Sequence, residues 1–214
     1  IPSALAGTPT RIREDLRAPT LMIQAETDVV GVLNFYVARQ PDSDTVRTWE
    51  MAGTSHVDQH LLGPIADTFE CGAEINDGPM HLILKAALRG LDTWVRDGTP
   101  PPAAEPLEVV EAEGAPSYVR DDLGIVRGGV RTPPVDVPTR VLSGTPGPIS
   151  NVVCLLAGTT MPLSPGQLAD RYESVDAYEA EYAESLDATI AAGFILEEDR
   201  DAALDMAMPE VITG

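Results

Sequence analysis

Two stretches of sequence decide the fold of this chain: Ala18-Pro19-Thr20-Leu21-Met22-Ile23-Gln24-Ala25-Glu26-Thr27-Asp28 and Trp49-Glu50-Met51-Ala52-Gly53-Thr54-Ser55-His56. In the first, the mainly apolar run from Thr20 to Gln24 has the length of a strand covered on both faces, and acidic residues follow it. In the second, Thr45 to Met51 is predicted as a strand that ends in a glycine-containing turn with a histidine. The interval leaves room for one crossover helix, predicted over Val32 to Arg39, which would make the two strands parallel.

Asp28 and His56 follow the carboxyl ends of these two predicted strands. Functional sites in open α/β sheets gather at that edge. A carboxylate beside an imidazole is the acid–base part of a catalytic triad, in which the imidazole deprotonates a nucleophile and the carboxylate fixes its tautomer. We therefore predict Asp28 as the acid and His56 as the general base. Glu26 is an alternative acid, because residues two apart in a strand face the same side.

The same turn also contains the pattern His56-x-Asp58-x-His60, which could supply metal ligands. The helical zinc-protease motif requires a glutamate directly after its first histidine, and this chain has Val57 there. His81 is the only other histidine, so no second cluster of imidazoles is available. We therefore predict no metal site.

The nucleophile of such a triad is expected earlier in the chain, on a Gly-x-Ser-x-Gly turn between a strand and a helix. No such pentapeptide occurs in the 214 residues. Ser55 is disfavoured as a substitute, because neighbouring side chains on a turn normally diverge. The chain opens with Ile1-Pro2-Ser3 instead of an initiator methionine. We therefore expect it to be the C-terminal half of a hydrolase, whose N-terminal half supplies the serine.

The chain is strongly acidic, with 34 carboxylates against 14 basic residues and a net charge of −20. A nucleic-acid partner is excluded, because phosphate binding needs clustered cations. No stretch is long and apolar enough to predict a membrane span. Cys71 and Cys154 are the only cysteines. They form either one disulfide or two buried thiols, and a disulfide would imply an oxidising, extracytoplasmic compartment.

A stiff segment divides the chain into two parts. The strongest predicted helix runs from Pro79 to about Asp97, and Gly98 followed by Pro100-Pro101-Pro102 ends it. The remainder is mixed but mainly helical, with strands predicted over Leu107 to Glu111 and Pro138 to Leu142 and helices over Asp176 to Gly193 and Glu198 to Met206. We expect residues 1–98 to form the core that carries acid and base, and residues 99–214 to form a C-terminal extension.

Several blocks of the sequence together resemble one family. They are Gln24-Ala25-Glu26-Thr27-Asp28, Ala38-Arg39-Gln40-Pro41-Asp42-Ser43, Trp49 through Asp58, Asn76-Asp77-Gly78-Pro79, Leu91 through Pro101, Gly128-Gly129-Val130-Arg131-Thr132-Pro133, and Arg171-Tyr172 through Gly193-Phe194. In these blocks, which span nearly the whole chain, the sequence resembles the "alpha/beta hydrolase domain" branch of the α/β-hydrolase superfamily. The family's nucleophile elbow and oxyanion-hole loop have no counterpart among them.

The resemblance implies an α/β fold: the C-terminal half of an α/β-hydrolase, a mostly parallel sheet with flanking helices. It also implies that the mixed, mainly helical extension over residues 99–214 is packed on the same domain. It implies that Asp28 is the acid and His56 the base of a serine hydrolase, which cleaves small ester-like substrates through an acyl-enzyme and requires no cofactor. It also favours a Cys71–Cys154 pair. The alternative is a catalytically inactive α/β-hydrolase scaffold that acts as a binding protein.

Overall fold

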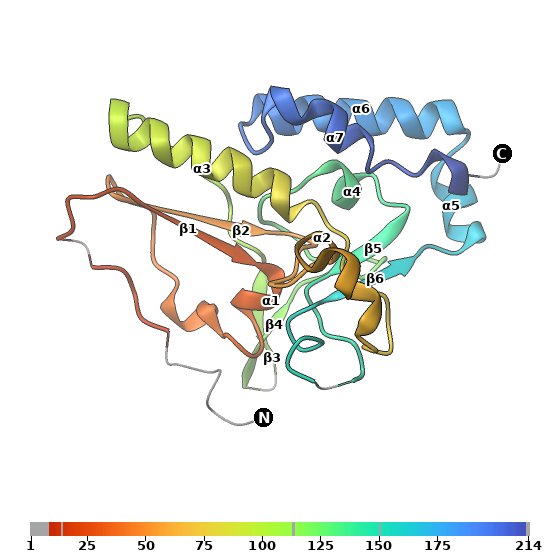
Figure 1. Ribbon diagram of the computed structural model, residues 1–214, viewed down its shortest axis with the longest axis horizontal. Coiled ribbons are helices and arrows are strands. Elements are labelled where there is room, and N and C mark those ends of the chain that lie inside the picture. The colour runs from red at the N-terminus through yellow and green to blue at the C-terminus, as the bar shows by residue number, and fades with distance from the viewer. Residues whose placement is uncertain (1–8, 14, 113, 150, 213–214) are drawn as a thin grey trace.

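The computed structural model describes residues 9–13, 15–112, 114–149 and 151–212 (Figure 1). In chain order its strands are β1 (Thr20–Ala25), β2 (Val46–Met51), β3 (Val109–Ala112), β4 (Ala115–Tyr118), β5 (Arg140–Ser143) and β6 (Thr159–Pro162). Its α-helices are α1 (Glu26–Val29), α2 (Gln59–Leu62), α3 (Met80–Asp97), α4 (Pro133–Asp136), α5 (Pro165–Arg171), α6 (Val175–Ala191) and α7 (Arg200–Leu204). Short 3₁₀ helices cover Phe35–Ala38, Gly63–Thr68, Glu197–Asp199 and Pro209–Val211.

The parallel pair β1–β2 is the part of the fold that the opening stretches predict. Thr20 lies opposite Val46 and Ala25 opposite Met51, so both strands end at the same edge. The chain turns into α1 directly after β1 and into a glycine turn directly after β2. This alignment brings the acidic residues after β1 next to the histidine turn after β2.

The helix α3 runs along one face of this pair (Figure 1). It begins after Pro79 and ends at Gly98, whose φ of 73° is in the left-handed region that favours glycine. Its apolar side, including Ile83, packs with Trp49 and Met51 of β2 in one buried cluster. The predicted helix and its boundaries are confirmed.

The expected mostly parallel sheet is seen only as β1–β2 in the part of the chain that the structure describes. The other strands form two antiparallel pairs, β3–β4 and β5–β6. Beyond the β1–β2 pair, one isolated parallel bridge joins Met51 of β2 to Val130. The described residues therefore combine small sheets with helices.

The predicted crossover helix over Val32 to Arg39 is wrong. Only Phe35–Ala38 is helical there, as one 3₁₀ turn, and Asn34 before it has a left-handed φ of 49°. Four of the eight residues of this segment are aromatic or β-branched, and these are weak helix formers. Residues 9–13 and 15–19, which the structure describes, contain no helix or strand before β1.

The segment after Gly98 shares its core with the segment before it. The largest buried cluster contains Val29 and Ala52 from the first part and Val135, Leu142 and Tyr178 from the second. In Figure 1, α6 and α7 lie beside the N-terminal half of α3. Leu82, Leu186 and Ile195 form a smaller buried cluster there. Among the helices that the structure describes, none has the length and apolar character needed to cross a membrane.

Trp49 anchors the contact between β2 and the later chain. Its side chain is fully buried, its indole N–H donates to the carbonyl of Pro102 at 2.8 Å, and Phe194 meets the ring edge-on at 5.0 Å. Trp49→Ala leaves a cavity, so it should lower the free energy of unfolding by about 3–5 kcal/mol in urea denaturation followed by circular dichroism. Leu88→Ala, at a side chain 66% exposed on α3, should change it by less than about 0.5 kcal/mol. A similar change in both variants would contradict this assignment of the core.

Candidate functional site

Asp28 sits in the single turn α1, immediately after β1. One carboxylate oxygen, Oδ2, accepts the backbone N–H of Ala25 at 2.8 Å, which closes the turn and fixes the side chain. The residue is only 7% exposed. Its other oxygen, Oδ1, is thus held in one direction by the local backbone.

His56 is presented by the turn after β2, in which Gly53 has a φ of 67°. A Cβ atom at Gly53 would lie 2.7 Å from Cγ2 of Val135, so only glycine fits. The backbone of Gly53 is also fixed on both sides, because its N–H donates to Glu26 Oε2 at 3.1 Å and its carbonyl accepts from Asn76 Nδ2 at 3.0 Å. The turn that aims the imidazole is therefore rigidly held.

Asp28 Oδ1 and His56 Nδ1 are 2.7 Å apart. The Asp28 side chain is 10% exposed, whereas the His56 side chain is 47% exposed. The hydrogen bond to Asp28 raises the pKa of His56 above its usual value of 6.5, against the opposing effect of burial. A buried carboxylate on one ring nitrogen leaves the opposite nitrogen, Nε2, for proton transfer, which is the arrangement of a general base and its orienting acid.

Glu26, the alternative acid, contacts other groups. It is fully buried, and its Oε1 pairs with Arg120 Nη2 at 2.6 Å and accepts from Ser143 Oγ at 3.1 Å. Its Oε2 accepts the Gly53 N–H. In the structure Asp28, and not Glu26, contacts the imidazole. Glu26 instead binds groups buried beneath the His56 turn.

The remaining polar residues of the turn also have other partners. The Ser55 hydroxyl is buried and donates to the Val57 carbonyl at 2.9 Å. Asp58 caps α2 by accepting the Leu61 N–H at 2.7 Å, and burial raises the pKa of its carboxyl group. In the described ranges, no group of three or more histidine, cysteine, aspartate or glutamate side chains is arranged to hold a metal ion.

His60, the second histidine of the pattern, stacks on His81 with ring centroids 3.7 Å apart. Burial, together with the charges of His60 and Lys85, lowers the pKa of His81 to about 4. The two rings thus form a packed pair with His81 neutral near pH 7. They do not converge with His56, which pairs with Asp28.

Cys71 and Cys154 are joined in a disulfide. The loop that carries Cys154 also contacts the His56 turn, because the Val57 N–H donates to the Leu156 carbonyl at 3.0 Å. The disulfide therefore tethers a loop that supports the backbone next to His56.

Sequence reasoning missed three side chains that hold the site together. Asn76 is fully buried and donates to the carbonyls of Gly53 and Ser143, at 3.0 and 3.2 Å. Arg120 neutralises Glu26, and the Tyr118 hydroxyl donates to the Glu26 carbonyl. Burial, more than the nearby Glu26, raises the pKa of Tyr118 well above its usual range. Their partners are far away in sequence, so only the block Asn76-Asp77-Gly78-Pro79 gave any signal.

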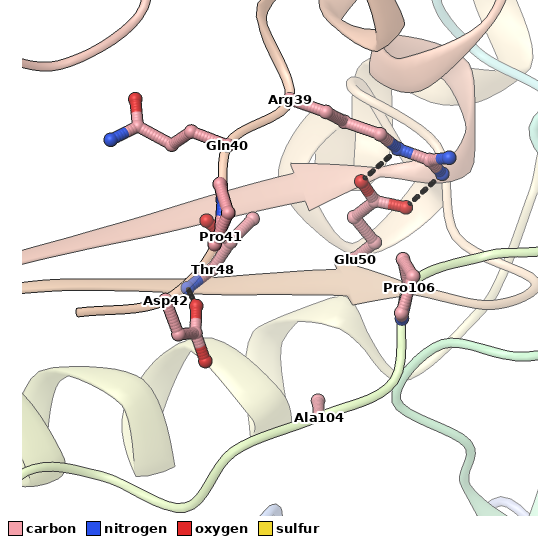
Figure 2. A pocket seen from close by; sticks show the side chains of 8 residues that line it. All are labelled: Arg39, Gln40, Pro41, Asp42, Thr48, Glu50, Ala104 and Pro106. Atoms are coloured by element: carbon pink, nitrogen blue, oxygen red, sulfur yellow. Dashed lines mark hydrogen bonds and ion pairs between the residues drawn. The ribbon is translucent and has the colours of Figure 1, made fainter.

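A cavity of about 440 Å³ lies away from this pair, beside β2. Figure 2 shows Arg39 and Glu50 facing each other in its wall, with nitrogen–oxygen distances of 2.7 and 2.5 Å. Glu50 also accepts the Leu107 N–H at 2.9 Å. Glu50 thus joins β2 to Arg39 and to the segment before β3. Neither Asp28 nor His56 lines this cavity.

A family model described as "alpha/beta hydrolase domain" matches residues 2–205. The chain belongs to the alpha/beta hydrolase domain family. The resemblance predicted from the sequence is therefore confirmed. Comparisons with curated proteins and with solved structures found no match.

The contact between Asp28 and His56 can be tested through the pKa of His56. Asp28→Asn removes the carboxylate that favours the imidazolium, so it should lower the pKa of His56 in an NMR titration of the ring protons. Asp92→Asn, on the exposed face of α3, is the matched control and should leave that pKa unchanged. An unchanged pKa in Asp28→Asn would show that the two side chains do not pair in solution.

The Cys71–Cys154 disulfide closes a loop between residues 83 positions apart. Loop-closure entropy for a loop of that size predicts that reduction lowers the free energy of unfolding by about 4–5 kcal/mol. Urea denaturation with and without dithiothreitol measures this difference. The variant with Cys71→Ala and Cys154→Ala should have the stability of the reduced chain, both with and without dithiothreitol. Equal stability of the oxidised and reduced chain would contradict the contribution assigned to the disulfide.

Proposed function

We propose that this alpha/beta hydrolase is a serine hydrolase that cleaves ester or similar acyl bonds through an acyl-enzyme. The observation that supports the proposal is the 2.7 Å contact between a buried Asp28 carboxylate and a half-exposed His56 imidazole. The two residues follow parallel strands at the same sheet edge, and the family is that of α/β hydrolases. The substrate class is small molecules with an ester-like bond.

In this proposal His56 works through Nε2. The neutral ring takes the proton of a serine hydroxyl as the oxygen attacks the acyl carbon, and it then gives that proton to the leaving alcohol. A water molecule repeats the sequence on the acyl-enzyme, which releases the acid and restores the serine. Asp28 stays ionised, holds the Nδ1–H tautomer and stabilises the imidazolium formed in each half-reaction.

The serine itself is proposed to come from outside residues 1–214, because these contain no Gly-x-Ser-x-Gly turn. Residues 1–98 would then be the C-terminal part of the catalytic core, and residues 99–214 an extension packed on it. The packing of the extension on the core is supported by the shared buried cluster and by Arg120 and Ser143 of the later segment, which contact Glu26.

Replacement of the acid tests the assigned roles. In the full-length protein, Asp28→Asn should lower kcat for an acyl ester by about 10⁴-fold, because the imidazole loses its tautomer and its counter-charge. Hydrolysis of p-nitrophenyl esters, with folding checked by circular dichroism, measures the effect. Asp92→Asn again supplies the control and should retain full activity.

Two results would overturn the proposal. Full activity in Asp28→Asn would remove Asp28 from the mechanism. A full-length protein with no esterase activity and no serine reactive towards a fluorophosphonate probe would instead favour an inactive scaffold that acts as a binding protein.

A further inference from the structure

The turn α1, which carries Asp28, is held at its end by a side chain from the later segment. A helical turn closes when the N–H of one residue reaches the carbonyl four residues earlier, as the Gly98 N–H does with the Trp94 carbonyl at the end of α3. At the end of α1 the Val30 N–H donates instead to the Tyr118 hydroxyl at 3.1 Å. The acceptor that ends this turn thus comes from 88 positions further along the chain.

The same hydroxyl also holds the start of α1. It donates to the Glu26 carbonyl, the group that the Val30 N–H would reach in a regular helical turn. A tyrosine hydroxyl has one donor proton and also accepts, so it can bind both groups at once. Burial raises the pKa of Tyr118 well above its usual range. The hydroxyl therefore keeps the proton that it donates while His56 titrates.

The position of the Asp28 carboxylate depends on this turn. Asp28 is the third of the four residues of α1 and lies between the two backbone groups that Tyr118 binds. One carboxylate oxygen accepts the Ala25 N–H at 2.8 Å, and the other is 2.7 Å from His56 Nδ1. Because one short side chain makes both contacts, a shift of the α1 backbone moves the carboxylate relative to the imidazole.

Tyr118 is itself fixed by its neighbours. It belongs to β4, which pairs with β3 and lies next to α1 (Figure 1). The Arg120 guanidinium lies over the Tyr118 ring, 5.3 Å from its centroid, and pairs with the Glu26 carboxylate at 2.6 Å. Tyr118 and Arg120 thus hold Glu26 by its carbonyl and its carboxylate, respectively.

We propose that Tyr118 is a positioning residue for the Asp28–His56 pair. Its hydroxyl joins both ends of α1 and so sets the direction in which Asp28 meets the imidazole. The effect of Tyr118 on catalysis rests on the function proposed above, whereas its effect on the contact between the two side chains does not. The β3–β4 hairpin, which follows Gly98, thereby controls the geometry of an acid and a base carried by the earlier segment.

Tyr118→Phe removes the hydroxyl and keeps the ring. The Glu26 carbonyl and the Val30 N–H then lose their shared partner, so the turn relaxes and the contact between Asp28 and His56 weakens. In an NMR titration of the 214-residue chain, the variant should therefore lower the pKa of His56 towards its usual value of 6.5. An unchanged His56 pKa in the folded variant would overturn the proposal.

Tyr182→Phe is the matched control. Tyr182 is also a buried tyrosine, and its hydroxyl donates to the Ala203 carbonyl at 3.0 Å, between α6 and α7. Both variants should be less stable than the wild-type chain in urea, because each loses a buried hydrogen bond. Only Tyr118→Phe should change the titration of His56. An equal change of the His56 pKa in both variants would reduce Tyr118 to a purely structural role and overturn the proposal.

Kinetics of the full-length protein test the link to catalysis. Tyr118→Phe should lower kcat for a p-nitrophenyl ester at least tenfold and leave KM unchanged, because the base is less well oriented in the transition state. A raised KM with unchanged kcat would overturn the positioning role. A lowered His56 pKa together with an inactive wild-type protein would keep Tyr118 as the residue that positions Asp28 and would reject the hydrolase function.

Hydrogen exchange of the wild-type chain gives a measurement that needs no variant. The Val30 N–H donates to a partly buried hydroxyl, so it should exchange at least tenfold more slowly than the amide of an unstructured peptide. Exchange at the rate of an unstructured peptide would overturn the proposed bridge, even if Tyr118→Phe fails to fold.

Discussion

The buried carboxylate of Glu26 is the constraint on which the site depends. It is fully inaccessible to solvent, yet it satisfies both oxygens with Arg120, Ser143 and the backbone of Gly53. A buried charge is tolerated only when it is paired and hydrogen-bonded, and loss of one partner from such a pair costs about 3–5 kcal/mol. Because the three partners come from the His56 turn and from two places in the later segment, this one group fixes the end of β1 against both.

Glu26 and Asp28 lie two residues apart, but their surroundings give them different tasks. Glu26 faces the interior and meets a guanidinium, so its charge is neutralised locally. Asp28 faces the site and meets an imidazole, whose own charge depends on pH. A second buried acid, Glu50, repeats the first arrangement, since Arg39 and the Leu107 N–H satisfy it. In a chain with few basic residues, these arginines are placed where buried carboxylates need them.

The parts of the fold predicted correctly are those with a local signal. The strands β1 and β2 are apolar runs with turn residues behind them, and α3 and α6 have clear caps or helical spacing. The meeting of Asp28 and His56 followed from one rule about parallel strands. The partners of Glu26 could not be predicted, because Arg120 and Ser143 lie 94 and 117 positions away and look like ordinary surface residues in sequence. The crossover helix over Val32 to Arg39 was predicted wrongly, because the segment is short and half of its residues are poor helix formers.

Protonation of His56 stabilises the folded site but lowers its proposed activity. The pKa of His56 is raised above 6.5 in the folded chain. The contact with Asp28 therefore contributes stability that is fully present below pH 6.5 and is lost as the pH rises through the folded pKa. A general base must be neutral, so the proposed activity increases over the same interval in which this stabilisation is lost. The site can tolerate that loss because the turn is held by groups that do not titrate there: the Gly53 backbone, Asn76 and the disulfide-tethered loop.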